Sequence, residues 1–505
     1  MKKSSLILFL AVTLFSKLSF AQSPYSTDGD NTFNSNAIHT VNLYFTDPNF
    51  WDSLMAYHAT DECYLGAVDI DGTYFDSVCV QLKGNSSFNS LPGVKKSIKI
   101  QFDEYVSQKF DGLKTINLNN SFKDPTMMRE KLMNDFLNAH GIPAPRCTYA
   151  NVYINGTLWG FYAICEQVNK TFLTYRFGDN DGNLFKGDPH GDLKWKGSSA
   201  SLYYNDYELK TNETLNDWSD LVHLLDELNN TPTANFHDSL ETVLNTDFAI
   251  KAWAANNMFV NLDSYLGSGH NYYIYHDTIT NKFNWIAWDV NEAFGNFNMG
   301  MSLTQIKNLS LTYISSPATS RPLINKMLQN VPYKTAYLDY LYQWIAYDFS
   351  PAYFYPKIDS IANVIRPYVY ADPNKQFTNA NFDFNIDHDM GNIPGLKDFI
   401  TDRSASIIQQ LVALGYTSAG ISNQFNPLIN IYPNPVTDNI IISNLDVKKN
   451  YTISLMDITG KKLISVQSSN NTQLIISRKN IASGIYVIEI NDQTTVSEKL
   501  KIILQ

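Results

Sequence analysis

Three side chains that can bind metal ions or accept protons lie between residues 256 and 295: Asp263, Asn271 and Asp289. Carboxylate and amide oxygens are ligands for Mg²⁺, and a carboxylate can also orient a hydroxyl group and accept its proton. Phosphoryl transfer in protein kinases uses such a set, with one Asp at the acceptor hydroxyl and an Asn and a second Asp on the metal ions. The same residue types also cap turns, so the spacing alone leaves a structural role open.

The elements that must position these side chains form a β-hairpin. Two runs rich in aromatic and β-branched residues, 272–275 and 283–288, predict strands, and the polar residues between them predict the turn. A hairpin returns its second strand to the level of its first. We therefore expect Asn271 and Asp289 at the same end of the hairpin, beside the loop that carries Asp263.

Residues further upstream could hold the phosphates of a nucleotide. Residues 94–102 predict a strand that carries Lys96, and residues 124–140 predict a helix that carries Glu130. In protein kinases a strand lysine binds the phosphates and a helix glutamate steadies it, which favours Lys96 with Glu130, or an immediate neighbour in place of either. A solvated lysine on an exposed strand face is the structural alternative. Residues 84–87, Gly-Asn-Ser-Ser, are either a phosphate-binding loop or a plain turn.

The motifs around these residues resemble the spore-coat protein H (CotH) kinase-like family. Its patterns N-x-D-x-Y, H-N-Y-Y-x-Y and W-D-x-x-x-x-F-G occur here in order, at residues 261–265, 270–275 and 288–295. Shorter upstream matches occur at residues 83–87, 95–100, 124–132 and 152–168. The likeness covers about residues 40–415 and keeps one order throughout, which makes it specific.

The resemblance implies an α+β fold, an atypical protein-kinase-like two-lobed domain. It also implies transfer of the γ-phosphoryl group of ATP to a hydroxyl acceptor, expected on a protein substrate, with Mg²⁺ or Mn²⁺ as the metal ion. Asp263 would be the catalytic residue, and Asn271 and Asp289 would bind the metal ion.

Two further residues are candidates for nucleotide binding. The resemblance extends to the segment Gly-Asn-Leu-Phe-Lys that ends at Lys186, so this lysine rivals Lys96 as the phosphate ligand. Glu166 follows a second predicted hairpin and either anchors a lysine or contacts the nucleotide.

A catalytically spent kinase scaffold that acts as a surface binding or structural protein is the alternative function. The presence of both Asp263 and Asp289 favours activity, because a degenerate site commonly loses one of them. The scarcity of ATP outside the cytoplasm favours the scaffold.

The first residues predict export. A basic start, a short apolar run over residues 6–15 and the small residues around Ala21 are typical of a signal peptide, residues 1–21. Residues 22–37 are rich in Ser, Asn and Asp and predict a flexible leader before the kinase-like domain, residues 38–415. No later segment reaches the ~18 continuous apolar residues of a transmembrane helix. The sequence therefore predicts a secreted or cell-surface protein that passes through the periplasm.

Composition limits the partners and suggests more than one domain. The 505 residues have a hydrophobic share of 44% and a formal net charge of −11. This length exceeds one ordinary core. The negative charge argues against nucleic acid as a partner, because phosphate backbones require a basic face.

Four cysteines flank two predicted hairpin turns, Asp71-Gly72 and Asn155-Gly156. A two-residue turn would leave Cys63 and Cys79, and likewise Cys147 and Cys165, one residue out of step, whereas a β-bulge would bring each pair together. Disulfides and free buried thiols both remain open.

The C-terminal segment predicts a separate small all-β sandwich. After a linker over residues 416–429, about seven short strands and turns alternate through residues 430–505. Tyr-Pro-Asn-Pro from Tyr432, the Asp457 to Lys461 turn and Gly-Ile-Tyr from Gly484 resemble the type A sorting domain of type IX secretion. The resemblance implies the secretion machinery as a partner, and an ordinary binding sandwich is the alternative.

Overall fold

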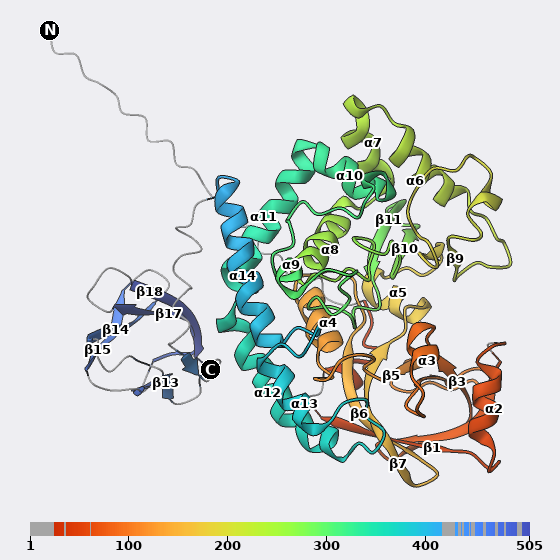
Figure 1. The fold of residues 1–505 in the computed structure, drawn as a ribbon, viewed down its shortest axis with the longest axis horizontal. Coiled ribbons are helices and arrows are strands. Elements are labelled where there is room, and N and C mark those ends of the chain that lie inside the picture. Colours follow the sequence, from red (N-terminus) through yellow and green to blue (C-terminus); the bar gives the residue numbers. More distant parts are fainter. Residues whose placement is uncertain are drawn as a thin grey trace.

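The computed structural model describes residues 25–416, except 35, 36 and 61, and residues 430–504 with several short gaps. The predicted signal peptide, and all but the first residue of the predicted linker, lie outside the described residues. The fold combines helices and sheets (Figure 1), as the sequence predicted. In the part of the chain that the structure describes, no helix is both long and apolar enough to cross a bilayer.

Seven strands near the start of the chain close into a barrel, in the order β1-β2-β3-β4-β5-β7-β6 (Figure 1). β1 closes the barrel because it pairs with both β2 and β6, so that Val41 lies opposite Ile70 on one side and Val152 on the other. Val80 and Ile100 belong with Val41 to one buried aliphatic cluster. The barrel was not predicted, because hairpin patterns do not show the pairing of two strands so distant in sequence. The strands are β1 (Ile38–Tyr44), β2 (Tyr64–Ile70), β3 (Thr73–Lys83), β4 (Ser97–Gln101), β5 (Thr115–Asn119), β6 (Cys147–Ile154) and β7 (Thr157–Glu166).

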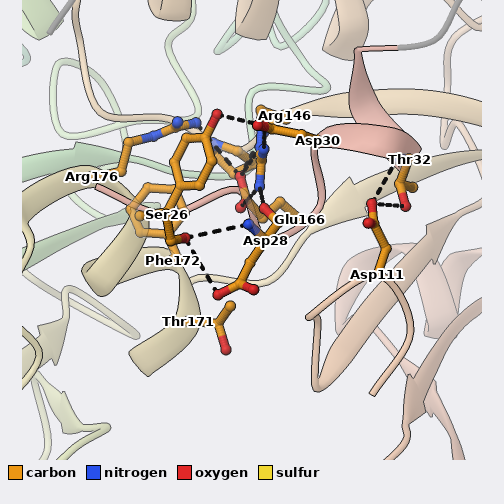
Figure 2. Close-up of polar contacts among 12 residues, drawn as sticks. Ser26, Asp28, Asp30, Thr32, Asp111, Arg146, Glu166, Thr171, Phe172 and Arg176 are labelled. Atoms are coloured by element: carbon orange, nitrogen blue, oxygen red, sulfur yellow. Dashed lines mark hydrogen bonds and ion pairs between the residues drawn. The ribbon is translucent and has the colours of Figure 1, made fainter. Parts of the chain in front are cut away.

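The prediction of a flexible leader is wrong for residues 25–34, which include helix α1 (Asp30–Phe33). The backbone amide and hydroxyl of Thr32 donate to Asp111 at 2.8 and 2.9 Å, and Arg146 donates to Asp30 at 2.9 Å (Figure 2). The polar residues that suggested flexibility are the ones that make these bonds.

The rest of the chain to residue 416 is mostly helical and contains a four-stranded sheet of order β11-β10-β8-β9. Helix α14 packs against α11, α12 and α13 along one side of the molecule (Figure 1). The strands are β8 (Leu184–Lys186), β9 (Glu208–Leu209), β10 (Tyr272–Asp277) and β11 (Lys282–Ala287). The helices are α5 (Lys170–Phe177), α6 (Ser219–Asn230), α7 (Phe236–Val243), α8 (Thr246–Met258), α9 (Leu303–Lys307), α10 (Pro322–Gln329), α11 (Val331–Tyr347), α12 (Pro351–Ala371), α13 (Asn379–Asp387) and α14 (Leu396–Ala413).

Three helices are encoded between the strands of the barrel: α2 (Phe50–Tyr57), α3 (Ser86–Ser90) and α4 (Arg129–Ala139). Although α4 lies between barrel strands in sequence, it packs into the helical core, where the Phe136 ring lies 5.0 Å from that of Phe259 and 5.3 Å from that of Trp344. The helix predicted from residue 124 starts at Arg129, because Asp124 accepts the backbone amides of Thr126 and Arg129 in a capping turn. α4 therefore links the barrel to the helical part.

β-bulges bring both cysteine pairs together. A register shift after Gly66 in the β2–β3 pair accompanies a disulfide between Cys63 and Cys79. A second shift, in the β6–β7 pair, places Cys147 directly opposite Cys165, with their sulfur atoms 2.8 Å apart as buried thiols.

The C-terminal unit consists of two antiparallel sheets that share one hydrophobic core. Ile453 and Ile488 from one sheet and Ile442 from the other are fully buried in this core. The three-stranded sheet contains β12 (Asn430–Tyr432), β13 (Asn439–Ser443) and β16 (Gln473–Ser477). The four-stranded sheet contains β15 (Lys462–Ser469), β14 (Asn450–Asp457), β17 (Gly484–Asn491) and β18 (Ser497–Leu504).

Candidate active site

The β10–β11 hairpin brings the predicted metal-binding residues to one end of its sheet. Tyr272 lies opposite Ala287, so Asn271 and Asp289, which flank this pair, leave the hairpin at the same end. The side-chain amide of Asn271 donates to the carbonyl oxygen of Asp263 at 2.8 Å, which fixes the neighbouring loop beside the hairpin. The structure therefore gathers the three residues that the sequence singled out.

Asn271 and Asp289 both have left-handed backbones, with φ of 61° and 52°. Non-glycine residues adopt this conformation rarely, although Asn and Asp do so most readily, and such positions concentrate at functional sites. The surrounding structure thus holds the chain in an unfavourable conformation at the two points where it leaves the hairpin.

The carboxylate of Asp289 has neighbours of both charges. It reaches solvent on one side, yet the protein around it raises its pKa, and the negative charge of Asp263 adds to this rise. The side chains that oppose the rise are Lys83, Lys186 and His270. A site with both signs of charge suits a ligand that carries both, such as a metal-bound phosphate chain.

Lys83 is the barrel lysine that faces these acids, and the sequence analysis did not select it. It ends β3, donates to Asn119 Oδ1 at 3.1 Å, and its ammonium lies 5.4 Å from the ring centre of Trp288. Burial lowers its pKa, while Asp289 and Glu130 oppose that change. One feature of the sequence pointed to it: Lys83 immediately precedes the Gly-Asn-Ser-Ser segment.

Glu130, in the first turn of α4, lies close to Lys83 but is joined to it through an amide. Asn119 Nδ2 donates to Glu130 Oε1 at 2.8 Å, while Asn119 Oδ1 accepts the bond from Lys83. Burial and the charge of Asp289 raise the pKa of Glu130 to about 7, against the opposing effect of Lys83. The predicted helix glutamate therefore lies at the site, with Lys83 as the lysine beside it.

Lys96 does not lie with Glu130, and that predicted pairing is wrong. Its ammonium donates to the carbonyl oxygen of Phe88 at 2.6 Å and to that of Leu91, and it lies 4.9 Å from the centre of the Phe88 ring. These bonds hold the segment around α3 against the barrel. Alternation along the strand could not reveal this, because the segment that captures Lys96 is irregular.

Glu166 is enclosed by arginines rather than by a lysine (Figure 2). Its two carboxylate oxygens accept bonds from Arg146 at 2.6 and 3.1 Å, and Arg176 lies 3.5 Å away. The Glu166 carboxylate therefore joins β7 to the loop before β6 and to α5. The prediction that it anchors a lysine is wrong.

Lys186 lies at the end of β8, beside the hairpin, with Tyr273 of β10 opposite it. Its ammonium contacts Asp188 and lies 3.9 Å from Glu208 Oε1. Burial alone would lower its pKa, but Tyr273, Asp188 and Glu208 together raise it, so the side chain stays charged. Because Lys186 also lowers the pKa of Asp289, it remains a candidate phosphate ligand.

Glu292 is a further carboxylate at the site, and the sequence motifs did not point to it. The side chain is 5% exposed, and its Oε2 has no hydrogen-bond partner among the described residues. Its Oε1 lies 3.2 Å from Lys123 Nζ. Burial raises the pKa of Glu292 to about 7, with Lys123 opposing the rise and Asp263 and Asp289 adding to it.

The residues present fit a divalent cation. Carboxylate and amide oxygens are the hard ligands that Mg²⁺ and Mn²⁺ prefer. Asn271 uses its amide nitrogen for the bond to Asp263, which leaves its oxygen for a cation. Desolvation by the surrounding protein is the largest cause of the raised pKa of Asp289 and Glu292, and a bound cation would stabilise the charged forms of both carboxylates.

Comparison with known proteins agrees with the motifs. A family described as "CotH kinase protein" matches residues 80–407, and the "Secretion system C-terminal sorting domain" matches residues 430–505. The chain is 28% identical over 298 residues to the inner spore coat protein H of Bacillus subtilis, an alignment that covers 57% of this chain and 77% of that protein. It is 23% identical over 311 residues to Invasin CotH2 of Rhizopus delemar, covering 56% of this chain and 50% of the fungal protein.

Proposed function

Because this chain belongs to the CotH kinase protein family, we propose that it is a phosphotransferase that moves the γ-phosphoryl group of ATP to a hydroxyl group, with a protein as the expected acceptor. The sorting domain implies export to the cell surface or secretion, through contact with the secretion machinery. The observation that carries the proposal is the gathering of Asp263, Asn271 and Asp289 at one end of the hairpin, facing Lys83.

Asp263 is the proposed catalytic residue. Its carboxylate would orient the acceptor hydroxyl and accept its proton as the oxygen attacks the phosphorus atom. Two contacts support this role, because they hold the residue in place from both sides. Asn271 bonds its carbonyl oxygen at 2.8 Å, and His270 Nε2 lies 3.4 Å from its Oδ1.

Lys83 and Lys186 are the proposed phosphate ligands. The charges of both lysines lower the pKa of Asp289, which supports a ligand shared between the lysines and that carboxylate. Glu130 is a positioning residue, because Asn119 connects it to Lys83 through two hydrogen bonds. The arrangement replaces the direct lysine–glutamate ion pair of protein kinases with an amide bridge.

Asn271 and Asp289 would hold a divalent cation, with Glu292 close behind them. When bound, the cation neutralises charge on the phosphate oxygens and orients the phosphate chain. The Glu292 oxygen that has no hydrogen-bond partner among the described residues supports this assignment.

A two-lobed kinase-like arrangement is part of the proposal, with the barrel as one lobe and the helical part as the other. The second candidate function is a kinase scaffold that binds without transferring. One observation favours it: Asn119 separates Lys83 from Glu130, whereas an active protein kinase pairs the lysine and glutamate directly.

Label transfer tests the proposal. Purified protein is incubated with γ-phosphate-labelled ATP, Mn²⁺ and a generic acceptor protein, with EDTA as the control. We expect labelled acceptor only with the metal ion present. Nucleotide binding without any transfer across a panel of acceptors would instead establish the scaffold.

A further inference from the structure

A cavity of about 570 Å³ is lined by residues of α4, α5, α8 and α12 and of the segments next to them. Its size is typical of small-molecule sites. Asp263, Asn271 and Asp289 are not among its lining residues, so it is separate from the candidate active site. Five cationic side chains line it: Lys131, Arg146, Arg176, Lys251 and Lys357.

The lysines of this cavity outnumber the carboxylates available to them. Asp135 is the one carboxylate among the lining residues, and it serves two lysines, with Lys131 at 2.7 Å and Lys357 at 3.4 Å. Lys251 pairs with Asp247 at 2.7 Å. Burial lowers the pKa of Lys357, and the charge of Lys131 lowers it further, against the attraction of Asp135. An anion bound between the lysines would relieve this repulsion.

The two arginines at the other side of the cavity share Glu166, and Arg146 also pairs with Asp30 (Figure 2). Their guanidinium groups lie 3.9 and 4.8 Å from the centre of the Tyr175 ring, which orients them. Arg176 Nε is buried without a hydrogen-bond partner among the described residues.

We propose that this cavity is a second binding site, for a small molecule that carries a multivalent oxyanion such as an oligophosphate group. Several cations spread around one cavity match a ligand with several negative oxygens. Aromatic side chains complete the wall and offer a surface for an organic part of the ligand: Phe33, Tyr175, Phe177 and Phe248. The binding itself does not depend on the proposed function.

Helix α4 connects this cavity to the candidate active site. Lys131 and Asp135 line the cavity, while the adjacent Glu130 bonds Asn119 next to Lys83. A ligand that binds Lys131 therefore contacts the same helix that positions Glu130. The expected consequence, a change in nucleotide affinity, rests on the proposed function, whereas occupancy of the cavity does not.

Calorimetric titration with inorganic tripolyphosphate in EDTA tests the site, because the chelator removes metal-dependent binding. We expect one site per chain, weakened about tenfold or more in a Lys251→Met, Lys357→Met variant, which loses two ammonium groups but keeps their apolar stems. Lys114→Met on the barrel, whose lysine pairs with Asp103, is the matched control and should bind like the parent.

The single variants Lys251→Met and Lys357→Met keep the test decisive if the double variant fails to fold, and each should weaken binding. Asp289→Ala should leave binding unchanged, because that carboxylate does not line the cavity. Any of three results would overturn the proposal. These are no binding by the folded parent, binding by the lysine variants as tight as that of the parent, and loss of binding in Asp289→Ala alone. Asp289→Ala also separates the two kinds of ligand when binding is measured in EDTA. Tighter binding of ATP than of tripolyphosphate would identify an organic ester as the ligand. Equal affinity for the two would identify a free oligophosphate.

Discussion

Two clusters of charged side chains differ in how completely their carboxylate oxygens are paired. At the Arg146 cluster, both carboxylate oxygens of Glu166 accept hydrogen bonds from Arg146, and Arg176 lies nearby. At the candidate active site, Glu292 leaves one buried oxygen without a partner among the described residues, and Asp289 has a raised pKa. The sequence motifs predicted a ligand-binding role for acids in both clusters, Glu166 and Asp289.

The difference separates a structural role from a binding role. A buried carboxylate whose charge is matched in the folded protein stabilises the fold, because removing its partner leaves a costly unpaired charge. A carboxylate whose charge is unmatched destabilises the empty site. A bound cation therefore stabilises such a site more than it stabilises one whose charges are already matched. Both glutamates are buried, but both oxygens of Glu166 are bonded to Arg146, whereas Glu292 has one oxygen bonded to Lys123 and the other without a partner among the described residues.

The largest expected effect is on catalysis. Asp263→Ala should lower the rate of phosphoryl transfer by ~10² to 10⁴, because it removes the group that orients and deprotonates the acceptor hydroxyl. Nucleotide affinity should stay close to that of the parent. Asp238→Ala, whose side chain is 94% exposed, is the control for label-transfer assays. Equal rates for Asp263→Ala and the parent would remove this residue from the chemistry.

The Arg146 cluster should respond in stability instead. Arg146→Met leaves the buried Glu166 with Arg176 alone at 3.5 Å, and we expect a loss of about 3–5 kcal/mol in the free energy of unfolding measured with urea. Arg366→Met removes a half-exposed pair with Asp383 and should cost no more than about 1 kcal/mol. Similar losses in the two variants would show that the cluster is not a structural one.

The pH dependence of stability should reveal the unmatched carboxylate. The pKa of Glu292 is about 7 in the folded protein and 4.5 as its ordinary value, so the folded state holds a proton that the unfolded state releases. The free energy of unfolding should therefore fall as pH rises from 4.5 to about 7, by up to about 3 kcal/mol from this group.

Glu292→Gln should reduce that fall when stability is measured in EDTA across the same pH range, because glutamine does not titrate. Exposed Glu213 provides the control variant Glu213→Gln, which should keep the pH profile of the parent. An unchanged profile for Glu292→Gln would show that Glu292 is not an unmatched acid in the folded state.

The smallest effect should come from removing the C-terminal unit, whose core is separate from both clusters. Deletion of residues 430–505 should change the melting temperature of the remaining domain little, because that domain has its own core. It should instead leave the protein in the periplasm, as measured by cell fractionation. Equal secretion of the truncated and complete proteins would contradict the sorting role.

The sequence predicts local features of the site well. The β10–β11 hairpin has strong strand patterns separated by a polar turn, and its register alone places Asn271 beside Asp289. The cysteine pairs likewise needed only a bulge in each hairpin, and the structure has both bulges. Features that depend on one hairpin can be predicted from the sequence, because few competing arrangements of a hairpin exist.

Features that depend on distant contacts were not accessible. Choosing Lys83 over Lys96 requires knowing which residues from other elements surround each lysine, and the strand pattern carries no such information. Closure of the barrel by β1 and β6 could not be predicted for the same reason, because it pairs strands that are distant in sequence. Glu292 was missed because its burial depends on how the chain turns after β11.

Binding of Mn²⁺–ATP to the parent and to Asp289→Ala, measured by calorimetry, tests the central claim most directly. An unmatched acid that serves a metal ion should be essential for nucleotide binding, so the parent should bind and Asp289→Ala should lose most of its affinity while remaining folded. In the same experiment Asp238→Ala should bind like the parent. Undiminished Mn²⁺–ATP binding by Asp289→Ala would contradict the assignment of this cluster as the nucleotide site.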